Sequence, residues 1–374
     1  DMLTVSRRFR FSSSFTENSE KFYGFNFELW VKISGKLDPL TGFICHLSEV
    51  KNILDPIIDK LDHQHLNDIT FDSKQKNKKF DLFNFLDKLS NLIASSLNDH
   101  ELSLVDCRLT APKNLQLFHS DGKITVSYIN KMVIPQLERA SIKWAVGDLK
   151  IDFTSTKTPT EMESLFNEID SGFPENMQEG IEKLILSNKN TAQGSNMNEM
   201  SSKMYSMENN CSELYVNYLM DEFGKNKNIQ IESIQIESNS GYVYQLKNDG
   251  HYHGFNMTAH AGHSLNQPKL TTDEAETAFG PCSNKHGHSF KFGFMMQIKT
   301  YLDEGIESTK NQASQAKDSL AFFRDLENSW LNNKIPVIPC TGENMISWIA
   351  NRFDFLGNIV CIETENNQFN WTKK

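Results

Sequence analysis

Histidines are concentrated in one stretch of the chain. Six of the eleven lie in residues 251–288, and two of these, His286 and His288, are separated by a single residue. Side chains two residues apart in a β-strand point to the same face, so these two imidazoles project together if a strand begins there. The preceding strand-like run ends in Ala-His-Ala-Gly-His, so His260 or His263 supplies a third imidazole beside them. Three histidines with an open fourth position are typical of a catalytic zinc site.

Cys282 lies four residues before His286, and it is the one cysteine of six whose neighbours indicate chemistry. A thiolate can bind zinc, but as a ligand it would fill the position that a catalytic zinc leaves open. A nearby cation also lowers the pKa of a thiol and favours the thiolate, which acts as a base or a nucleophile. We therefore expect Cys282 to be a reactive thiol beside the metal, with coordination as the alternative.

The composition restricts the classes of protein to consider. The chain has 374 residues, 38% of them hydrophobic and 23% charged, which is typical of a soluble globular protein with more than one domain. The formal net charge of −10 argues against broad binding of nucleic acid, which needs a basic face. No run approaches the ~20 apolar residues that span a bilayer, and no apolar signal-peptide segment is visible. We expect a cytoplasmic protein with a small-molecule ligand and no nucleic-acid or membrane partner.

One pattern of elements occurs three times along the chain. Each copy has two strand-like runs, then a helical pattern, then two further strand-like runs joined by a short turn. The strand-like runs alternate apolar and polar residues, which predicts one buried face. We call the copies the first repeat (1–120), the second repeat (121–248) and the third repeat (249–374). In the second repeat, residues 187–210 are rich in Asn, Ser and Met and are predicted to form a surface loop.

The repeats predict an α+β fold class. Each repeat is expected to be a four-stranded antiparallel sheet with helices on one face. Open strand edges promote aggregation, so neighbouring repeats should cover one another's edges. Three repeats in one chain could close a ring that a simpler protein builds from three subunits, which would be an intramolecular pseudo-trimer. Two such chains could then pair as a homodimer.

The histidine-containing segments resemble the family of 6-pyruvoyltetrahydropterin and 6-carboxytetrahydropterin synthases. The family's Phe-Ser-Ala-x-His-Arg-Leu strand is similar to Ala261–Leu265. Spacing alone leaves His260 and His263 as alternatives, and the resemblance selects His263.

The family's Phe-Gly-Lys-Cys segment, followed by His-Gly-His, resembles Phe279–Cys282 and His286–His288. The three residues between the two segments look more like the carboxy-forming branch than the animal pyruvoyl-forming branch. The resemblance implies a tunnelling fold (T-fold) in each repeat and one zinc ion (Zn2+) in the third. The residues that it implies are the catalytic Cys282 and the zinc ligands His263, His286 and His288.

Two C-terminal segments look like pterin-binding segments of the same family. Cys361–Asn367 is similar to a Glu-Thr-x-Asn-Asn segment whose glutamate anchors the pterin, and Thr341–Asn344 resembles a Thr-x-Glu-Asn helix start. The substrate-binding residues implied in this way are Glu363, Thr341 and Glu343.

The first repeat carries a different part of the family pattern. Gly35–Phe43 looks like the turn after the second strand, and Leu61–Asn67 looks like the catalytic Leu-Asp-His segment. This implies that Asp62 and His63 are catalytic. The three ligand positions hold aromatic residues instead, so no zinc is expected in this repeat: Phe15, Tyr23 and Phe25.

The third repeat keeps the histidine ligands but lacks the Asp-His pair, because Leu326-Glu327-Asn328 stands where Leu-Asp-His is expected. In family members the Asp-His pair reaches the active site from a neighbouring subunit. Asp62 and His63 are therefore expected to face the zinc of the third repeat and to form one composite active site with it. The second repeat matches only in layout and in Gln235–Ser238, and it is interpreted as structural.

The resemblance implies a lyase that acts on 7,8-dihydroneopterin triphosphate, releasing triphosphate and rearranging or cleaving the side chain, in tetrahydropterin or queuosine biosynthesis. Zinc would polarise the side-chain oxygens. Cys282 would move a proton, and His63, oriented by Asp62, would be the partner acid or base. The alternative is a non-catalytic homologue that binds zinc and pterin, which the change to Glu327-Asn328 favours.

Overall fold

The computed structural model describes most of the chain. The described residues are 1–17, 21–71, 80–112, 114–138, 141–155, 212–213, 215–221, 223–225, 227–298 and 301–374. The surface loop predicted for residues 187–210 lies outside these residues. Within them, no helix is long and apolar enough to cross a membrane.

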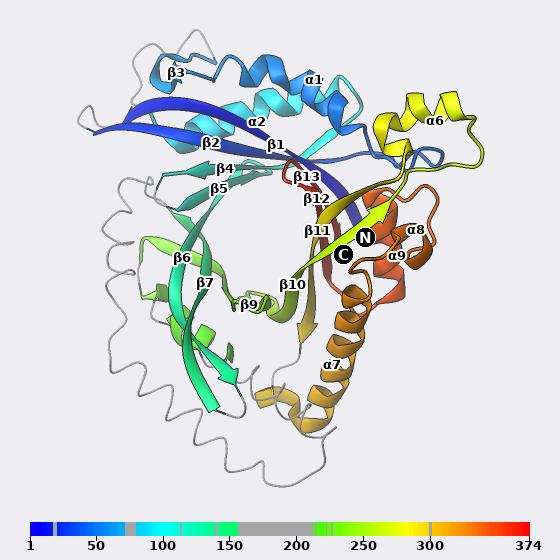
Figure 1. Cartoon of the computed structure of the whole chain (residues 1–374). Helices are drawn as coiled ribbons and strands as arrows, with labels where there is room; N and C mark the ends of the chain where they lie inside the picture. The colour runs from blue at the N-terminus through cyan, green and yellow to red at the C-terminus, as the bar shows by residue number, and fades with distance from the viewer. Residues whose placement is uncertain are drawn as a thin grey trace. The chain divides into compact units, whose positions relative to one another are not determined.

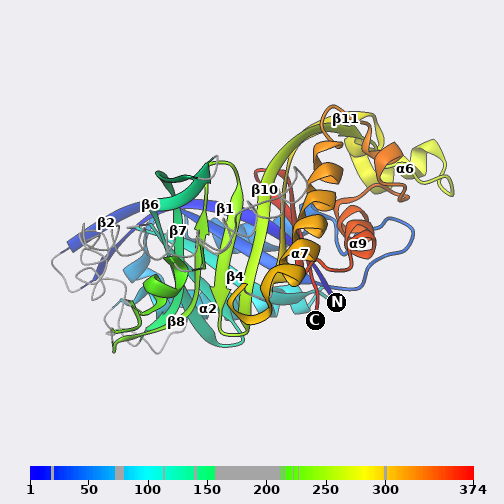
Figure 2. The ribbon, with the colours of Figure 1, turned by 90° about the horizontal axis from the view of Figure 1, so that it is seen from below.

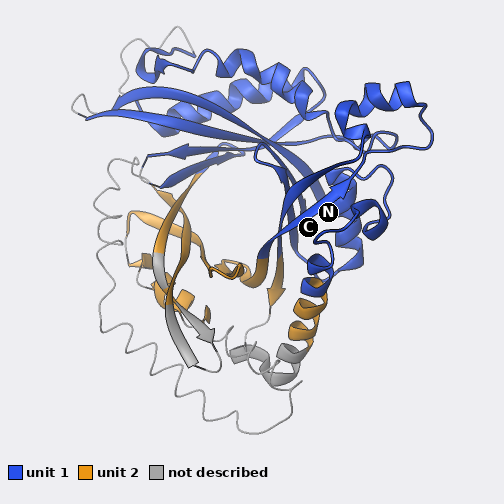
Figure 3. Ribbon diagram, in the orientation of Figure 1, with its two compact units in different colours: residues 1–124, 256–294, 320–374 blue, residues 125–255, 295–319 orange. Residues whose placement is uncertain are grey.

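The chain is divided into two compact units, shown in Figure 3. Unit 1 consists of residues 1–124, 256–294 and 320–374, and unit 2 consists of residues 125–255 and 295–319. Unit 1 therefore combines the first repeat with much of the third.

The first repeat contributes an antiparallel sheet to unit 1, with strand order β1-β2-β4-β5. A short strand, β3, lies parallel to β1 at Ser13 and Ser14. The strands are β1 (Met2–Glu17), β2 (Lys21–Ser34), β3 (Gln64–His65), β4 (Ser103–Ala111) and β5 (Leu115–Ser120), and the helices are α1 (Leu47–Ile58), η1 (Leu66–Asp68) and α2 (Leu82–Asn98).

Alternation along the strands decides which face is buried. In β1, Phe9 and Phe11 are buried, and the Phe11 ring stacks on Phe27 of β2 with 5.0 Å between centroids. Helix α2 begins after Asp81, whose side chain accepts a hydrogen bond from the Phe83 amide. One apolar stripe of α2 is buried, at helical spacing: Leu82, Phe85, Leu86, Leu89, Ile93 and Leu97. Figure 1 shows α1 and α2 on one side of this sheet, as the predicted α+β layout requires.

The third repeat contributes neighbouring strands in the order β10-β11-β12-β13. Its strands are β10 (Gly250–His263), β11 (His286–Ile298), β12 (Asn358–Thr364) and β13 (Asn367–Thr372). Its helices are α6 (Thr272–Phe279), η3 (Gly280–Ser283), α7 (Tyr301–Arg324), α8 (Leu331–Lys334) and α9 (Gly342–Arg352).

The first and third repeats share one sheet within unit 1. Strands β1 and β13 pair antiparallel, from Met2 opposite Thr372 to Arg7 opposite Asn367. Figures 1 and 2 both show the two chain ends side by side, as this pairing requires. Strand β13 pairs with residues 2–7 of β1, and β3 pairs further along at Ser13 and Ser14, while β2 pairs with residues 5–17.

Unit 2 contains the second repeat. Its antiparallel strands follow the order β6-β7-β8-β9, and the first residues of β10 pair with β9. These strands are β6 (Lys123–Glu138), β7 (Ser141–Ser155), β8 (Ile229–Glu237) and β9 (Tyr242–Lys247).

Candidate active site with a three-histidine cluster

The structure brings together the three histidines that the sequence indicates as zinc ligands. His263 is the last residue of β10, and His286 is the first residue of the adjacent strand β11. One ligand nitrogen from each of the three side chains lies within 4.8 Å of the others. His288 completes the group, with its ring centroid 5.4 Å from that of His263. His260 lies outside this cluster.

Strand alternation and one phenylalanine position the imidazoles. In β11, residues 286, 288 and 290 share a face, and Phe290 is fully buried in the core. Its ring lies 5.3 Å from both the His263 ring and the His288 ring, edge to face in each case. The three histidines therefore pack against the core of unit 1.

The unpartnered nitrogen atoms of the cluster fit a metal ion. His263 Nδ1 lies 3.2 Å from the Cys340 carbonyl oxygen, and His286 Nδ1 lies 2.8 Å from the Asn284 carbonyl oxygen. A carbonyl oxygen can only accept, so each Nδ1 carries the proton and each Nε2 presents a lone pair. The Nε2 atoms of His263 and His286 are buried without a hydrogen-bond partner. Buried polar atoms are rarely left unsatisfied, and a zinc ion would satisfy both.

The protonation of the cluster suits metal binding. Burial, followed by the neighbouring His286, lowers the pKa of His263 to about 4. Burial and the same neighbour also lower the pKa of His288. Both imidazoles are therefore neutral at pH 7, which is the form that coordinates a metal.

A partly exposed acidic residue, Glu363, lies beside the cluster, with 17% of its side chain exposed. It stands near the end of β12, with Oε1 3.5 Å from His263 Nε2 and 3.8 Å from His288 Nε2. Burial raises the pKa of Glu363 to about 7. When ionised, the Glu363 carboxylate can accept hydrogen bonds from a bound heterocycle.

A second acidic residue, Glu343, lies in the first turn of α9. Thr341 caps this helix by accepting a hydrogen bond from the Asn344 amide. Glu343 is 1% exposed, and its Oε1 accepts a 3.2 Å hydrogen bond from the Ile44 amide while its Oε2 has no partner. Burial raises the pKa of Glu343 to about 8.

The first repeat covers this helix end with residues 40–44. Thr341 Oγ1 donates to the Gly42 carbonyl oxygen at 2.9 Å, and Gln267 Nε2 donates to the Leu40 carbonyl oxygen at 3.0 Å. The ring of Phe43 packs edge to face on Phe279, with 5.8 Å between centroids. The surroundings of Glu343 are therefore built from both repeats.

Replacing Glu343 with glutamine should stabilise the protein increasingly as pH rises from about 4.5 to 8. Below pH 4.5 the folded and unfolded states both hold the proton. Between 4.5 and the raised pKa of about 8, the unfolded state loses the proton while the folded state keeps it, so wild-type stability falls. The glutamine does not titrate, and its advantage should grow by about 3–4 kcal/mol between pH 5 and pH 8, since each pKa unit corresponds to about 1.4 kcal/mol. Urea unfolding at pH 5 and pH 8 measures this difference, with Glu276→Gln on the exposed face of α6 as control. An equal effect at both pH values would contradict the prediction.

Cys282 lies in η3, between α6 and β11, and is exposed. Its carbonyl oxygen accepts a 2.9 Å hydrogen bond from the Leu265 amide, which ties η3 to the residues after β10. Desolvation, followed by the Glu363 carboxylate, raises the pKa of the Cys282 thiol. The protein groups therefore do not produce the lowered pKa of Cys282 that the sequence predicts. A lowered pKa would require the positive charge of a bound metal.

Asp62 and His63 form a hydrogen-bonded dyad in another part of unit 1. Asp62 Oδ2 lies 2.8 Å from His63 Nδ1, and Asp62 Oδ1 accepts from the Ser12 amide at 2.7 Å. The His63 side chain is 81% exposed, and its backbone has a φ of 56°.

The structure does not place this dyad beside the three histidines. Ser12, whose amide binds Asp62, lies five residues beyond Arg7, the last residue of β1 that pairs with β13. At ~3.4 Å per strand residue, Arg7 and Ser12 are about 17 Å apart. Figure 1 shows β3, directly after the dyad, at the opposite end of β1 from the histidine-bearing ends of β10 and β11. The expectation that Asp62 and His63 face the zinc is therefore not met within one chain.

Aromatic packing replaces the ligand cluster in the first repeat. The ring of Phe15 stacks on that of Tyr23 with 5.0 Å between centroids, and Phe25 packs edge to face on Phe27 at 5.1 Å. These side chains offer no imidazole nitrogen for a metal.

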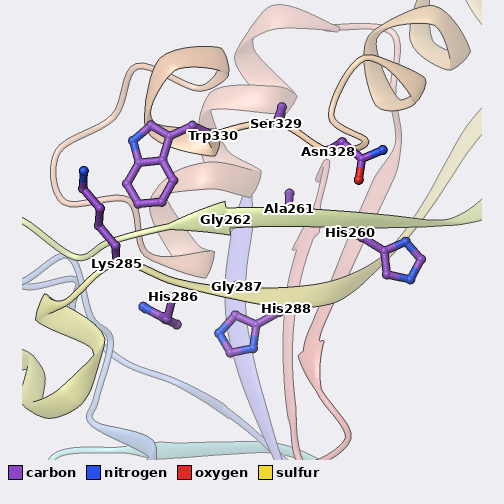
Figure 4. A pocket seen from close by; sticks show the side chains of 10 residues that line it. All are labelled: His260, Ala261, Gly262, Lys285, His286, Gly287, His288, Asn328, Ser329 and Trp330. Atoms are coloured by element: carbon purple, nitrogen blue, oxygen red, sulfur yellow. The ribbon is translucent and has the colours of Figure 1, made fainter.

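An open pocket of about 640 Å³ borders the cluster (Figure 4). Its lining includes Lys285 and Trp330, and the lysine ammonium lies 5.8 Å from the indole ring centroid. Neither residue has a distinctive spacing, so only the fold reveals them. The lining residues are His260, Ala261, Gly262, Lys285, His286, Gly287, His288, Asn328, Ser329 and Trp330.

Comparisons with known proteins define the class. The family model for 6-pyruvoyl tetrahydropterin synthase matches residues 3–249, and the chain belongs to this family. A 6-pyruvoyl tetrahydrobiopterin synthase from Dictyostelium discoideum is 30% identical over 117 residues, which cover 29% of this chain and 84% of that protein. A structure of Caenorhabditis elegans 6-pyruvoyl tetrahydropterin synthase is matched with a TM-score of 0.27 and 18% identity, over 33% of this chain and 95% of that one.

The family match ends before the histidine cluster begins. Residues 3–249 contain the first and second repeats, whereas the cluster starts at His263. Family membership and the metal-binding geometry are therefore separate observations.

Proposed function

We propose that this protein is a zinc-dependent lyase of the 6-pyruvoyl or 6-carboxytetrahydropterin synthase type, acting on 7,8-dihydroneopterin triphosphate. The observation that carries the proposal is the pair of buried, unpartnered Nε2 atoms of His263 and His286, beside His288. Membership of the 6-pyruvoyl tetrahydropterin synthase family supports a pterin substrate.

In this proposal His263, His286 and His288 hold one zinc ion. When bound, the ion would polarise oxygen atoms of the substrate side chain. The Glu363 carboxylate would accept hydrogen bonds from the amino group and a ring N–H of the pterin, and its distance of 3.5 Å from His263 Nε2 supports binding of the ring beside the metal site. Thr341 and Glu343, at the start of α9, are the other residues proposed to bind the substrate.

Cys282 is the residue proposed to move a proton. It is exposed, adjoins β11 through η3, and is close enough to Glu363 for that carboxylate to affect its pKa. Removing a proton next to a developing carbonyl and returning it elsewhere is the step that rearrangement of the side chain requires.

The active site is proposed to be composite between the first and third repeats. Its support is the contact of residues 40–44 with α9, including the hydrogen bond from Ile44 to Glu343. The pairing of β1 with β13 and the one-repeat length of the Dictyostelium match support a tandem of T-fold repeats, which we propose to close as an intramolecular pseudo-trimer.

A role for Asp62 and His63 stays a prediction and requires a second copy of the chain. The dyad is hydrogen-bonded and exposed, so a neighbouring molecule could present it to the zinc site. A homodimer and a cytoplasmic location are likewise predictions.

The proposed function is tested by incubating zinc-loaded protein with 7,8-dihydroneopterin triphosphate and identifying the products by mass. Release of triphosphate with formation of a 6-pyruvoyl or 6-carboxy pterin is expected. The second candidate function is zinc and pterin binding without turnover, which Asn328 at the expected histidine position favours. Tight pterin binding with no substrate consumption would support that candidate and contradict the lyase.

A further inference from the structure

Residues 327–332, which we call the edge segment, cover one edge of β10 beside the histidine cluster. Strand β9 pairs only with the first part of β10, residues 250–255. Further along the same edge, the Gly262 amide donates to the Ser329 carbonyl oxygen at 2.9 Å (Figure 4). The edge segment therefore takes the place of a neighbouring strand where β10 reaches its last residue, the proposed ligand His263.

The side chain of Asn332 completes this edge. Ser264 directly follows His263; its amide donates to Asn332 Oδ1 at 3.0 Å, and its carbonyl oxygen accepts from Asn332 Nδ2 at 2.9 Å. An amide side chain has one acceptor and one donor group, so it can pair with both backbone groups of one residue, as a neighbouring strand does. Ser264 is 8% exposed, so water has little access to replace these two hydrogen bonds.

His263 is held by its backbone neighbours as well as by its ring contacts. Gly262 and Ser264, on either side of it, are both hydrogen-bonded to the edge segment. The ring itself is oriented by the Cys340 carbonyl oxygen and packs on Phe290. A zinc–nitrogen bond is only about 2.0–2.1 Å long and follows the direction of the lone pair. A shift of the end of β10 would therefore move His263 Nε2 out of position.

The first repeat has the same arrangement without the metal ligands. The Thr16 amide donates to Asn67 Oδ1 at 2.9 Å, and Asn67 Nδ2 donates to the Thr16 carbonyl oxygen at 2.9 Å. Thr16 directly follows Phe15, as Ser264 directly follows His263. One asparagine therefore holds the strand beside a proposed metal ligand, and the other holds it beside a phenylalanine.

A carboxylate marks the other end of each edge. Asp62 Oδ1 accepts from the Ser12 amide at 2.7 Å, and Glu327 Oε2 accepts from the His260 amide at 2.8 Å. Glu327 Oε1 also lies 3.1 Å from His260 Nδ1. The carboxylate precedes the asparagine by the same number of residues in both repeats. The hydrogen bonds therefore align Phe15 with His263 independently of the family resemblance.

We propose that Asn332 is a positioning residue of the metal site: its pairing with Ser264 fixes His263 and thereby sets the affinity of the three histidines for zinc. The inference rests on the zinc site of the proposed function, but it requires neither the pterin substrate nor turnover. Groups that orient metal ligands without touching the metal typically change the affinity by about 10- to 100-fold when they are removed.

Zinc affinity tests this role directly. Asn332→Ala should weaken zinc binding by about 10- to 100-fold, measured by competition with a chromophoric zinc chelator. Asn67→Ala is the matched control, because it removes the same pair of backbone hydrogen bonds beside Phe15, where no imidazole is available. This control should bind zinc as tightly as the wild type.

Hydrogen exchange and urea unfolding of the zinc-free proteins separate positioning from general stability. The Ser264 amide should exchange faster in Asn332→Ala than in the wild type and should be unchanged in Asn67→Ala. Both variants should lower the urea midpoint, because each loses two hydrogen bonds, so a zinc defect confined to Asn332→Ala would not follow from lost stability. Should Asn332→Ala fail to fold, Asn332→Asp, which keeps the acceptor but loses the donor, replaces it with the same expectation.

The outcomes separate this inference from the proposed function. If the wild type holds no zinc, the metal assignment fails, and the role of Asn332 fails with it. If the wild type holds zinc and Asn332→Ala binds it as tightly as Asn67→Ala, the inference is overturned while the metal site stands. If the wild type holds zinc but converts no substrate, the lyase proposal fails, and a weakened affinity of Asn332→Ala still supports the inference.

Discussion

Replacing His286 with alanine should release the zinc and abolish turnover. His263, His286 and His288 are the one ligand group that the described residues offer, and loss of one imidazole leaves two nitrogen ligands for an ion that prefers four. The His263 Nε2 atom would then lack any partner except the distant Glu363 carboxylate, 3.5 Å away. Zinc in the gel-filtered variant should fall close to zero, and product formation should fall to the uncatalysed rate.

The control for this variant is His100→Ala, which changes the same residue type far from the cluster. It should retain the zinc and the activity of the wild type. If His286→Ala kept a full equivalent of zinc, the ligand assignment would be wrong.

Replacing Cys282 with alanine should leave the zinc in place and lower turnover by about 10²- to 10⁴-fold. Cys282 is exposed and lies outside the three-histidine group, so the metal does not need it. Its proposed role is proton transfer, which alanine cannot perform because it has no ionisable group. Zinc analysis and single-turnover kinetics measure the two effects separately.

Cys282→Ser is the matched variant, because it keeps the size of the side chain but replaces the thiol with a hydroxyl that ionises far less readily. It should be nearly as slow as the alanine variant. Isolation of Cys282→Ala without zinc would show that the thiol is a ligand, and full activity of both variants would remove Cys282 from the mechanism.

Local patterns predict that the histidines lie together, although the choice of His263 over His260 depends on the family resemblance. Alternation in β11 is enough to put His286 and His288 on one face, and the adjacent β10 supplies the third imidazole. The buried stripe of α2 follows in the same way from helical spacing.

Long-range contacts were outside the reach of such patterns. The hydrogen bond between Ile44 and Glu343 joins residues 299 positions apart, and no periodicity indicates it. The position of Asp62 depends on which half of β1 pairs with β13, a register that the sequence does not reveal. The contact between Glu327 and His260 is unpredictable for a similar reason, because the two residues are 67 positions apart.

The most direct test of the account is the zinc content of the purified wild-type protein. The protein would be loaded with zinc, dialysed to remove weakly bound metal and measured by elemental mass spectrometry against its concentration. One zinc per chain is predicted, because the third repeat supplies three imidazoles whereas the first repeat has Phe15, Tyr23 and Phe25 at the corresponding positions. A chain without zinc, or one with two or three equivalents, would contradict the account.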